Sequence, residues 1–135
     1  MSFTELSHTA DVRIRVEAVS PEHLFSDAFL ALMQTVFGTD RKGGTRRQVQ
    51  VESADRESLL LDFLSEVLFI CEVDGLVFSR AEITLSGNSI SALLEGEPFD
   101  RSRHSSGTEV KGISYSGLAI VQDADGYRAD ILFDV

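Results

Sequence analysis

Two long segments of the chain carry apolar residues at three- and four-residue spacing, and this pattern constrains the fold more than any other feature. In the first, Pro21–Phe37, the apolar side chains fall on one face, and Ser20-Pro21-Glu22 before them is typical of a helix N-terminus. The second follows Asp55, a favourable N-cap residue, and ends at Asp74-Gly75. Each segment predicts an amphipathic helix that buries one face against another layer.

The remaining segments are typical of β-strands. Alternation over residues 11–19 predicts a half-buried strand directly before the first helix. Ser86-Gly87-Asn88 indicates a hairpin turn, and Asp100–Gly107 is expected to be a mobile loop. Further strands are expected over residues 48–52, 77–85, 89–95, 109–116, 118–122 and from 127 to the end. The order predicts an α+β, two-layer domain in which two amphipathic helices pack on a mainly antiparallel sheet.

Length and charge narrow the function classes. A chain of 135 residues fits one folding unit, so a single domain over residues 1–135 is expected. Its formal net charge of −10 repels phosphate backbones and anionic lipid head groups at long range. We therefore expect little direct nucleic-acid binding and no binding to membranes.

The single cysteine and the N-terminus indicate a cellular compartment. Cys71 follows an apolar run, so it is predicted to be a buried core thiol, and alone it cannot form an internal disulfide. No basic, apolar or membrane-length segment resembles a targeting signal or a transmembrane span. The expected localisation is cytoplasmic.

Carboxylates at the two ends of the chain are the first candidate site. Ser7-His8-Thr9-Ala10-Asp11 forms a polar turn before a strand, and the final strand ends in Asp134 and Val135. If these two strands are neighbours, Asp11, Asp134 and the α-carboxylate of Val135 converge into an all-oxygen cluster. Such a cluster needs a hard cation such as Ca²⁺ or Mg²⁺ to offset its repulsion. A turn that satisfies its own backbone donors and a solvated C-terminal Asp are the alternative interpretation.

Five ordered motifs together resemble the archease family over essentially the whole chain. They are His8-Thr9-Ala10-Asp11, Leu59-Leu60-Leu61-Asp62-Phe63-Leu64-Ser65-Glu66, Gly96-Glu97, His104 followed by Thr108-Glu109-Val110-Lys111, and Phe133-Asp134-Val135. Three positions depart from the family pattern: Gly112 replaces a frequent alanine, Ser114 a threonine and Ser116 a frequent histidine.

The resemblance implies a function that spacing alone does not give. Archeases are small accessory proteins of an RtcB-type tRNA-splicing RNA ligase, which they help to guanylylate and to turn over repeatedly. A tRNA methyltransferase is an alternative partner. The family fold consists of strand-helix-strand-strand modules. The family's calcium-type site corresponds to Asp11, Asp134 and Val135, and residues that act on the partner correspond to Lys111, Asp40 and His8.

Two other functions stay open at this stage. A metal-dependent hydrolase would use Asp11 and Asp134 to hold the ion and His8 or His104 as base. A tRNA-binding or chaperone-like module would use a local basic segment, which consists of Arg41, Lys42, Arg46 and Arg47. The absence of a nucleophile elbow, a phosphate-binding loop or a zinc-protease motif favours a non-catalytic protein.

Overall fold

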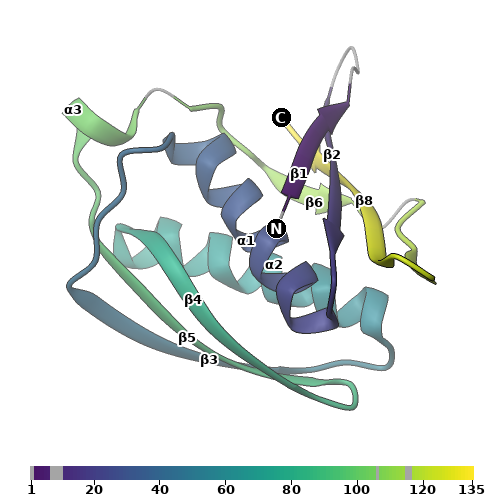
Figure 1. The fold of residues 1–135 in the computed structure, drawn as a ribbon. Coiled ribbons are helices and arrows are strands. Elements are labelled where there is room, and N and C mark those ends of the chain that lie inside the picture. The colour runs from purple at the N-terminus through teal and green to yellow at the C-terminus, as the bar shows by residue number, and fades with distance from the viewer. Residues whose placement is uncertain (1, 7–10, 106, 115–116) are drawn as a thin grey trace.

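The computed structural model describes residues 2–6, 11–105, 107–114 and 117–135 (Figure 1). Along the described chain the strands are β1 (Ser2–Leu6), β2 (Asp11–Ala18), β3 (Thr45–Glu52), β4 (Leu76–Ser86), β5 (Ser89–Pro98), β6 (Gly112–Ser114), β7 (Ile120–Asp123) and β8 (Gly126–Asp134). The helices are α1 (Pro21–Phe37), α2 (Arg56–Asp74) and the short α3 (Arg101–His104).

Local capping explains why the two long helices start and end where they do. The Ser20 hydroxyl accepts a hydrogen bond from the His23 amide, and the Asp55 carboxylate accepts one from the Ser58 amide at 2.7 Å. This bond to the Ser58 amide lowers the pKa of Asp55. Gly38 and Gly75 follow the last helical residues with positive φ angles of 81° and 63°. The predicted extents of both helices are confirmed.

The strands form two antiparallel sheets. The first has the order β1-β2-β8-β6, with β7 also paired to β8, and the second has the order β3-β5-β4. The second sheet arises from one strand-helix-strand-strand module, β3-α2-β4-β5. In the first sheet, β2 and the last strand, β8, are neighbours. They pair antiparallel over the whole of β2.

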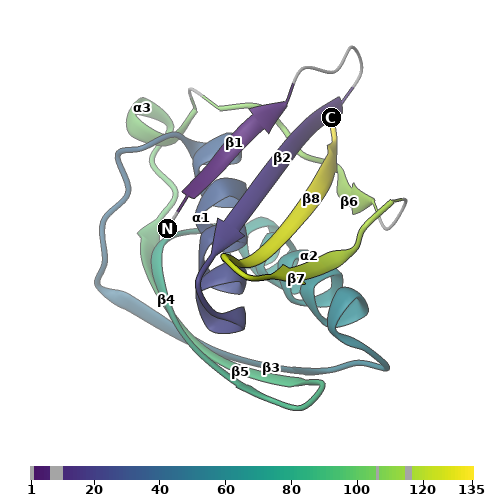
Figure 2. The same ribbon diagram turned by 45° about the vertical axis from the view of Figure 1, so that its right-hand side comes forward.

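The two long helices lie between these sheets, as Figures 1 and 2 both show. α1 contacts β2 and β4, one strand from each sheet, and α2 contacts β3, β4 and β6. Phe63 of α2 packs against Phe25 and Phe29 of α1, with ring centroids 6.3 and 6.5 Å apart. The fully buried side chains of this core include Phe25, Phe29, Phe63, Phe78, Phe133, Ile14, Leu24, Leu32, Met33, Leu59, Leu60 and Leu64.

The α+β class and the antiparallel pairing are confirmed, and some details differ. The strands divide into two sheets, so the helices are covered on two sides rather than packed on one sheet as expected. β1 was not expected. Within the predicted strand 109–116, the described residues that form a strand are those of β6, and Val110 is buried outside the sheet. The expected mobile loop 100–107 contains α3. Among the described residues, no helix is long and apolar enough to cross a membrane.

Candidate functional site

Asp11 and Asp134 lie directly opposite each other in the antiparallel pairing of β2 with β8. Asp134 also pairs with Gly112 on its other side, so the three residues form a row across β2, β8 and β6. Directly opposed residues of antiparallel strands present their side chains on the same face, with Cβ atoms about 4.5–5.5 Å apart. The register therefore places the two aspartates side by side on one face of the sheet, as expected if their strands are neighbours. Both residues are partly exposed.

Gly112 leaves the flank of the Asp134 carboxylate open. A Cβ atom placed on Gly112 would lie 3.8 Å from Asp134 Oδ2, which is an ordinary van der Waals distance. A glycine here therefore exposes one side of that carboxylate to solvent without being sterically required. Compared with an alanine, this glycine lacks a methyl group beside the candidate site and no chemical function.

Main-chain contacts hold the backbone of Lys111 next to the backbone of Asp134. The Lys111 amide donates to the Asp134 carbonyl at 2.7 Å, and the preceding Val110 is buried at 2 % exposure. Upstream, the Thr108 amide donates to the Thr35 carbonyl of α1 at 2.8 Å. The backbone of this segment is thus fixed on both sides, and the exposed Lys111 side chain starts from a defined position beside Asp134.

Gly107 is the residue that permits this docking. A Cβ atom on Gly107 would lie 2.2 Å from the Val36 carbonyl oxygen and 2.4 Å from its carbonyl carbon, both main-chain atoms of α1. Because the backbone cannot yield easily, only glycine lets segment 107–111 approach the C-terminal end of α1 this closely. The glycine therefore contributes to placing Lys111.

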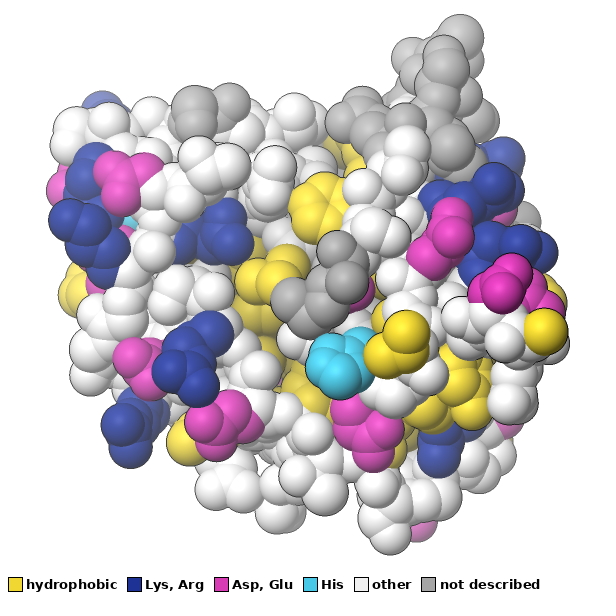
Figure 3. Space-filling view, viewed as in Figure 1, with side chains coloured by type: hydrophobic (Ala, Val, Ile, Leu, Met, Phe, Trp, Pro, Cys, Tyr) yellow, Lys and Arg dark blue, Asp and Glu magenta, His cyan; other side chains and the backbone are white. Residues whose placement is uncertain are grey.

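Arginines occupy the face on which Asp11 and Asp134 lie. Residues of β2 and β8 alternate between core and solvent, which places Arg13, Arg15 and Arg128 on the outer face with the two aspartates. Arg15 pairs with Asp130 through two hydrogen bonds of 2.8 and 3.1 Å, and these bonds lower the pKa of Asp130. Figure 3 shows this mixture of cationic and acidic side chains at the right-hand edge, over β2 and β8.

Among the described residues, no group of three or more His, Cys, Asp or Glu side chains is placed to hold one ion. Asp11 and Asp134 supply two carboxylates, and Val135 follows with main-chain oxygens. Oxygen-only donors suit Ca²⁺ or Mg²⁺. The predicted residue His8 lies outside the described residues.

Asp40 does not join this group. Its carboxylate lies 3.6 Å from the Arg103 guanidinium, which belongs to α3. Figures 1 and 2 both place α3 away from the C-terminal end of β8. The site residues predicted from the sequence therefore divide into an Asp11–Asp134–Lys111 group and the separate position of Asp40.

Glu97 is the centre of the cluster around α3. Its carboxylate accepts hydrogen bonds from the Arg103 guanidinium, at 3.0 Å for one pair, and from the Lys42 amide at 2.7 Å. The Arg103 hydrogen bonds, followed by the Lys42 amide, lower the pKa of Glu97 to about 2. The cluster links the α1–β3 connection to the end of β5. Gly96 before it is required, because a Cβ atom there would lie 2.2 Å from the Val77 carbonyl oxygen.

Both ring nitrogens of His104 are occupied within this cluster. Nδ1 accepts from the Asp100 amide at 2.8 Å, and Nε2 lies 3.2 Å from Glu97 Oε2. Because Nδ1 accepts, the proton resides on Nε2, which donates to the carboxylate. His104 is 1 % exposed. It is therefore a structural residue that closes α3, and the hydrolase hypothesis loses it as a base.

Asp27, on α1, is the other buried polar side chain of the described chain. Its backbone partner is Ser2 of β1, while Oδ2 has no hydrogen-bond partner among the described residues. Burial raises the pKa of Asp27. Its environment fastens β1 to the helix and does not face the Asp11–Asp134 pair.

Three arginines of the predicted basic segment contact other groups of the protein. Arg41 donates to the carbonyls of Phe78 and Gly38, and burial lowers its pKa. Arg47 lies 3.6 Å from Asp74, and Arg46 lies 4.0 Å from a carboxylate oxygen of Glu95. Because of these contacts, the three arginines are less available to bind a nucleic-acid phosphate.

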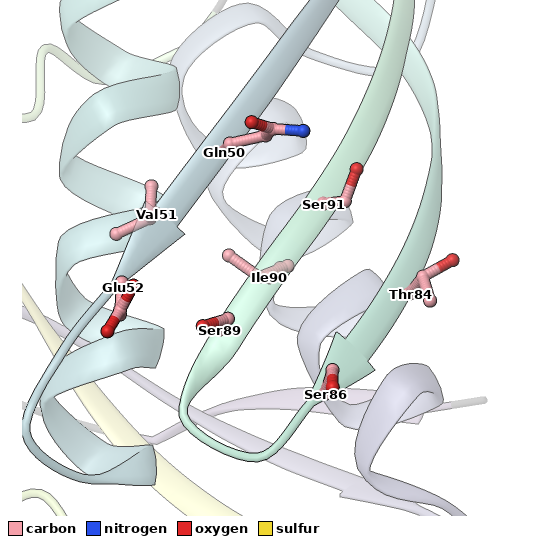
Figure 4. A pocket seen from close by; sticks show the side chains of 8 residues that line it. All are labelled: Gln50, Val51, Glu52, Thr84, Ser86, Ser89, Ile90 and Ser91. Carbon is pink, nitrogen blue, oxygen red and sulfur yellow. The ribbon is translucent and has the colours of Figure 1, made fainter.

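A shallow depression on the β3-β5-β4 sheet offers no catalytic chemistry. It has a volume of ≈ 370 Å³, and Figure 4 shows Gln50, Ser91 and Thr84 of three neighbouring strands along it. In register, Gln50 pairs with Ser91, which pairs with Thr84, so they form one polar row. Glu52 is its single titratable lining residue. None of the predicted site residues in the described part of the chain lines this depression.

Sequence reasoning missed the α3 cluster as a structural unit. Gly96-Glu97 and His104 were noted as motif residues, yet nothing local showed that Arg103 and His104 both reach Glu97. The available signal was the concentration of Asp100, Arg101 and Arg103 after a strand, which is also typical of a solvated loop.

Comparisons with known proteins identify the family. The chain matches the archease protein family (MTH1598/TM1083) over residues 3–135. It is 36% identical to protein archease of Methanosarcina barkeri over 136 residues, covering 96% of this chain and 93% of that protein. It is 34% identical to protein archease-like of Drosophila melanogaster over 142 residues, covering 100% and 91%.

Solved structures agree with this fold. The solution structure of Methanobacterium thermoautotrophicum protein 1598 superimposes with a TM-score of 0.86 at 25% identity, covering 98% of each chain. The crystal structure of a Thermotoga maritima protein, described as an archease and possible chaperone, has the same fold, with a TM-score of 0.69 at 23% identity, covering 96% and 94%. With the family matched from residue 3 to residue 135 and the fold shared, the chain belongs to the archease family.

Proposed function

We propose that this protein is a non-catalytic accessory protein that activates an RtcB-type tRNA-splicing RNA ligase, promoting guanylylation of the ligase and multiple turnover. Membership of the archease family supports an accessory role. The observation that carries the proposal is the direct opposition of Asp11 and Asp134 beside Lys111 at one end of the first sheet. This arrangement places two carboxylates and a lysine at one end of the first sheet.

The proposed activating surface consists of Asp11, Asp134, Val135 and Lys111. Two carboxylates in register repel each other, and a divalent cation between them offsets that repulsion. Asp11, Asp134 and the main-chain oxygens of Val135 would hold a Ca²⁺-type ion, which would supply a positive charge fixed at the strand end. The Lys111 side chain adds a second positive charge, and the backbone of Lys111 is hydrogen-bonded to that of Asp134.

Net charge supports a basic partner. A ligase that grips RNA presents Lys and Arg side chains, which attract a protein of net charge −10. The rate of association then falls as salt concentration rises, because salt screens exposed charges. In this proposal the ligase binds the RNA substrates, and this protein promotes their ligation without binding RNA itself.

The test is a ligase guanylylation assay with and without this protein. The wild-type protein should raise the guanylylation rate, and Asp11→Ala and Lys111→Glu should reduce that stimulation by at least tenfold. Asp125→Ala is the matched control, because it removes an exposed aspartate from the β7–β8 turn and should leave the stimulation intact. Unchanged stimulation by both site variants would refute the assigned surface, and no stimulation by the wild-type protein would refute the function.

A further inference from the structure

The outward face of α2 carries an apolar centre. Residues spaced three and four apart lie on one face of a helix. Opposite the buried face of α2, six exposed residues form what we name the α2 stripe: Asp62, Ser65, Glu66, Phe69, Glu72 and Val73. Phe69 and Val73, one turn apart, are 57% and 64% exposed. A phenylalanine ring left this open to water has no role in the core of this domain.

Other exposed apolar side chains of the described residues are arranged differently. Phe99 packs its ring against Phe37 and His104, with centroids 6.2 and 5.8 Å away. Val19 is 77% exposed, but it stands alone between β2 and α1. Phe69 and Val73 are the pair that shares one helix face. Apolar side chains grouped with a polar border mark protein-binding surfaces.

The border of the α2 stripe is acidic. From residue 57 to residue 74 the sequence holds five acidic residues and no Lys or Arg. Of the acids on the stripe, Asp62 accepts a hydrogen bond from Ser53 at 2.7 Å, and none forms an ion pair within the described part of the chain. Asp74, next to the stripe, is the acid that Arg47 neutralises. Glu66 and Glu72 therefore lie on either side of Phe69 without an ion-pair partner among the described residues.

We propose that the α2 stripe is a docking surface for a protein partner that offers an apolar socket bordered by Lys and Arg. Phe69 fills the socket with Val73 beside it, and Asp62, Glu66 and Glu72 meet the basic border. A second copy of this chain is the wrong occupant, because two stripes would bring like charges together. This inference rests on the proposed function for the identity of the partner, the RNA ligase, and adds a docking surface formed by residues other than Asp11, Asp134 and Lys111.

Binding of the purified full-length chain to the purified ligase tests the docking surface. Phe69→Ser and Val73→Ser should each weaken the dissociation constant about tenfold, because buried aromatic and aliphatic anchors dominate interfaces. Glu66→Lys should weaken binding and reduce its salt dependence. Val19→Ser is the matched control, since it removes another exposed valine, at 77% exposure, and should bind like the wild-type protein. All variants should unfold at the wild-type temperature, because the mutated side chains are exposed.

Guanylylation separates this inference from the proposed function. Phe69→Ser at saturating concentration should give the wild-type maximal rate but require about tenfold more protein to reach it. If the wild-type protein binds and stimulates the ligase while Phe69→Ser, Val73→Ser and Glu66→Lys do so equally well, the docking surface is refuted and the function stands. If the wild-type protein does not bind the ligase, both are refuted. A wild-type dimer that Phe69→Ser converts to a monomer would assign the stripe to a second copy instead.

Discussion

Asp11 on β2 and Asp134 on β8 occupy directly opposite positions of an antiparallel pair, so that two carboxylates share one end of the outer sheet face. Like charges at such positions are destabilising by roughly 0.2–1 kcal/mol. Asp134→Asn should therefore raise the free energy of unfolding by about that amount in the presence of a chelator. The measurement is thermal or urea unfolding at neutral pH.

Calcium should reverse the order of stability of the wild-type protein and Asp134→Asn. An ion that binds only the folded state stabilises it increasingly with concentration, so millimolar Ca²⁺ should raise the unfolding temperature of the wild-type protein and not that of Asp134→Asn. Asp125→Asn serves as the control for loss of one exposed acid. An equal calcium response in all three proteins would contradict a cation site at Asp11 and Asp134.

Gly107 and Gly112 should respond in opposite ways to the same substitution. A methyl group on Gly107 would collide with the α1 backbone at Val36, whereas on Gly112 it would meet only Asp134 Oδ2 at 3.8 Å. Gly107→Ala should cost about 1–3 kcal/mol of unfolding free energy and reduce ligase stimulation by displacing Lys111. Gly112→Ala should stay within about 0.5 kcal/mol of the wild-type protein in urea unfolding. Equal stabilities would show that segment 107–111 is not fixed by this contact.

Glu97 should make stability depend on acid pH. Its pKa is lowered from 4.5 to about 2 in the folded protein, mainly by the Arg103 hydrogen bonds. The folded state therefore binds fewer protons, so this stabilisation is fully present above pH 4.5 and is lost as the pH falls toward 2. Glu97→Gln should be less stable at pH 7 by about 1–3 kcal/mol, with a shallower loss between pH 4.5 and 2.

Glu82 provides the control for that pH experiment. It pairs with Arg80 at 3.0 Å, but both side chains are more than half exposed, so Glu82→Gln should change stability little at any pH. Unfolding by urea at a series of pH values measures both variants. Parallel pH profiles for the wild-type protein and Glu97→Gln would show that the α3 cluster does not stabilise the fold.

Cys71 should be unreactive until the protein unfolds. Burial raises the pKa of its thiol to about 12, and its sulfur lies 4.0 Å from the Met33 sulfur in the core. Because the thiolate is the reactive form, a thiol-specific reagent at pH 8 should modify native protein at least a hundredfold more slowly than protein in denaturant. Rapid modification of the native protein would mean that α2 opens locally without global unfolding.

The sequence predicted the ends of α1 and α2 because caps are local. Ser20 and Asp55 each bond to an amide three residues along, and the glycines that follow adopt positive φ angles at no steric cost. The buried state of Cys71 was predictable for the same reason, since helical spacing alone places it with the apolar face. Strand β1 was not predictable, because its five residues are too few to show a clear alternation of apolar and polar side chains.

How distant segments meet depends on the packing of the whole core. Alternating apolar residues predict that Asp11 begins a strand and that Asp134 ends one, and the resemblance to the archease family links the two residues. Only the pairing of β2 with β8 places Asp11 opposite Asp134. This register depends on the rest of the chain, because it must turn the apolar faces of both strands toward the core. The same long-range packing separated the strands into two sheets and drew Asp40 toward Arg103 rather than toward Asp11. Local residue patterns therefore fixed the elements, and core burial fixed which of their ends form a site.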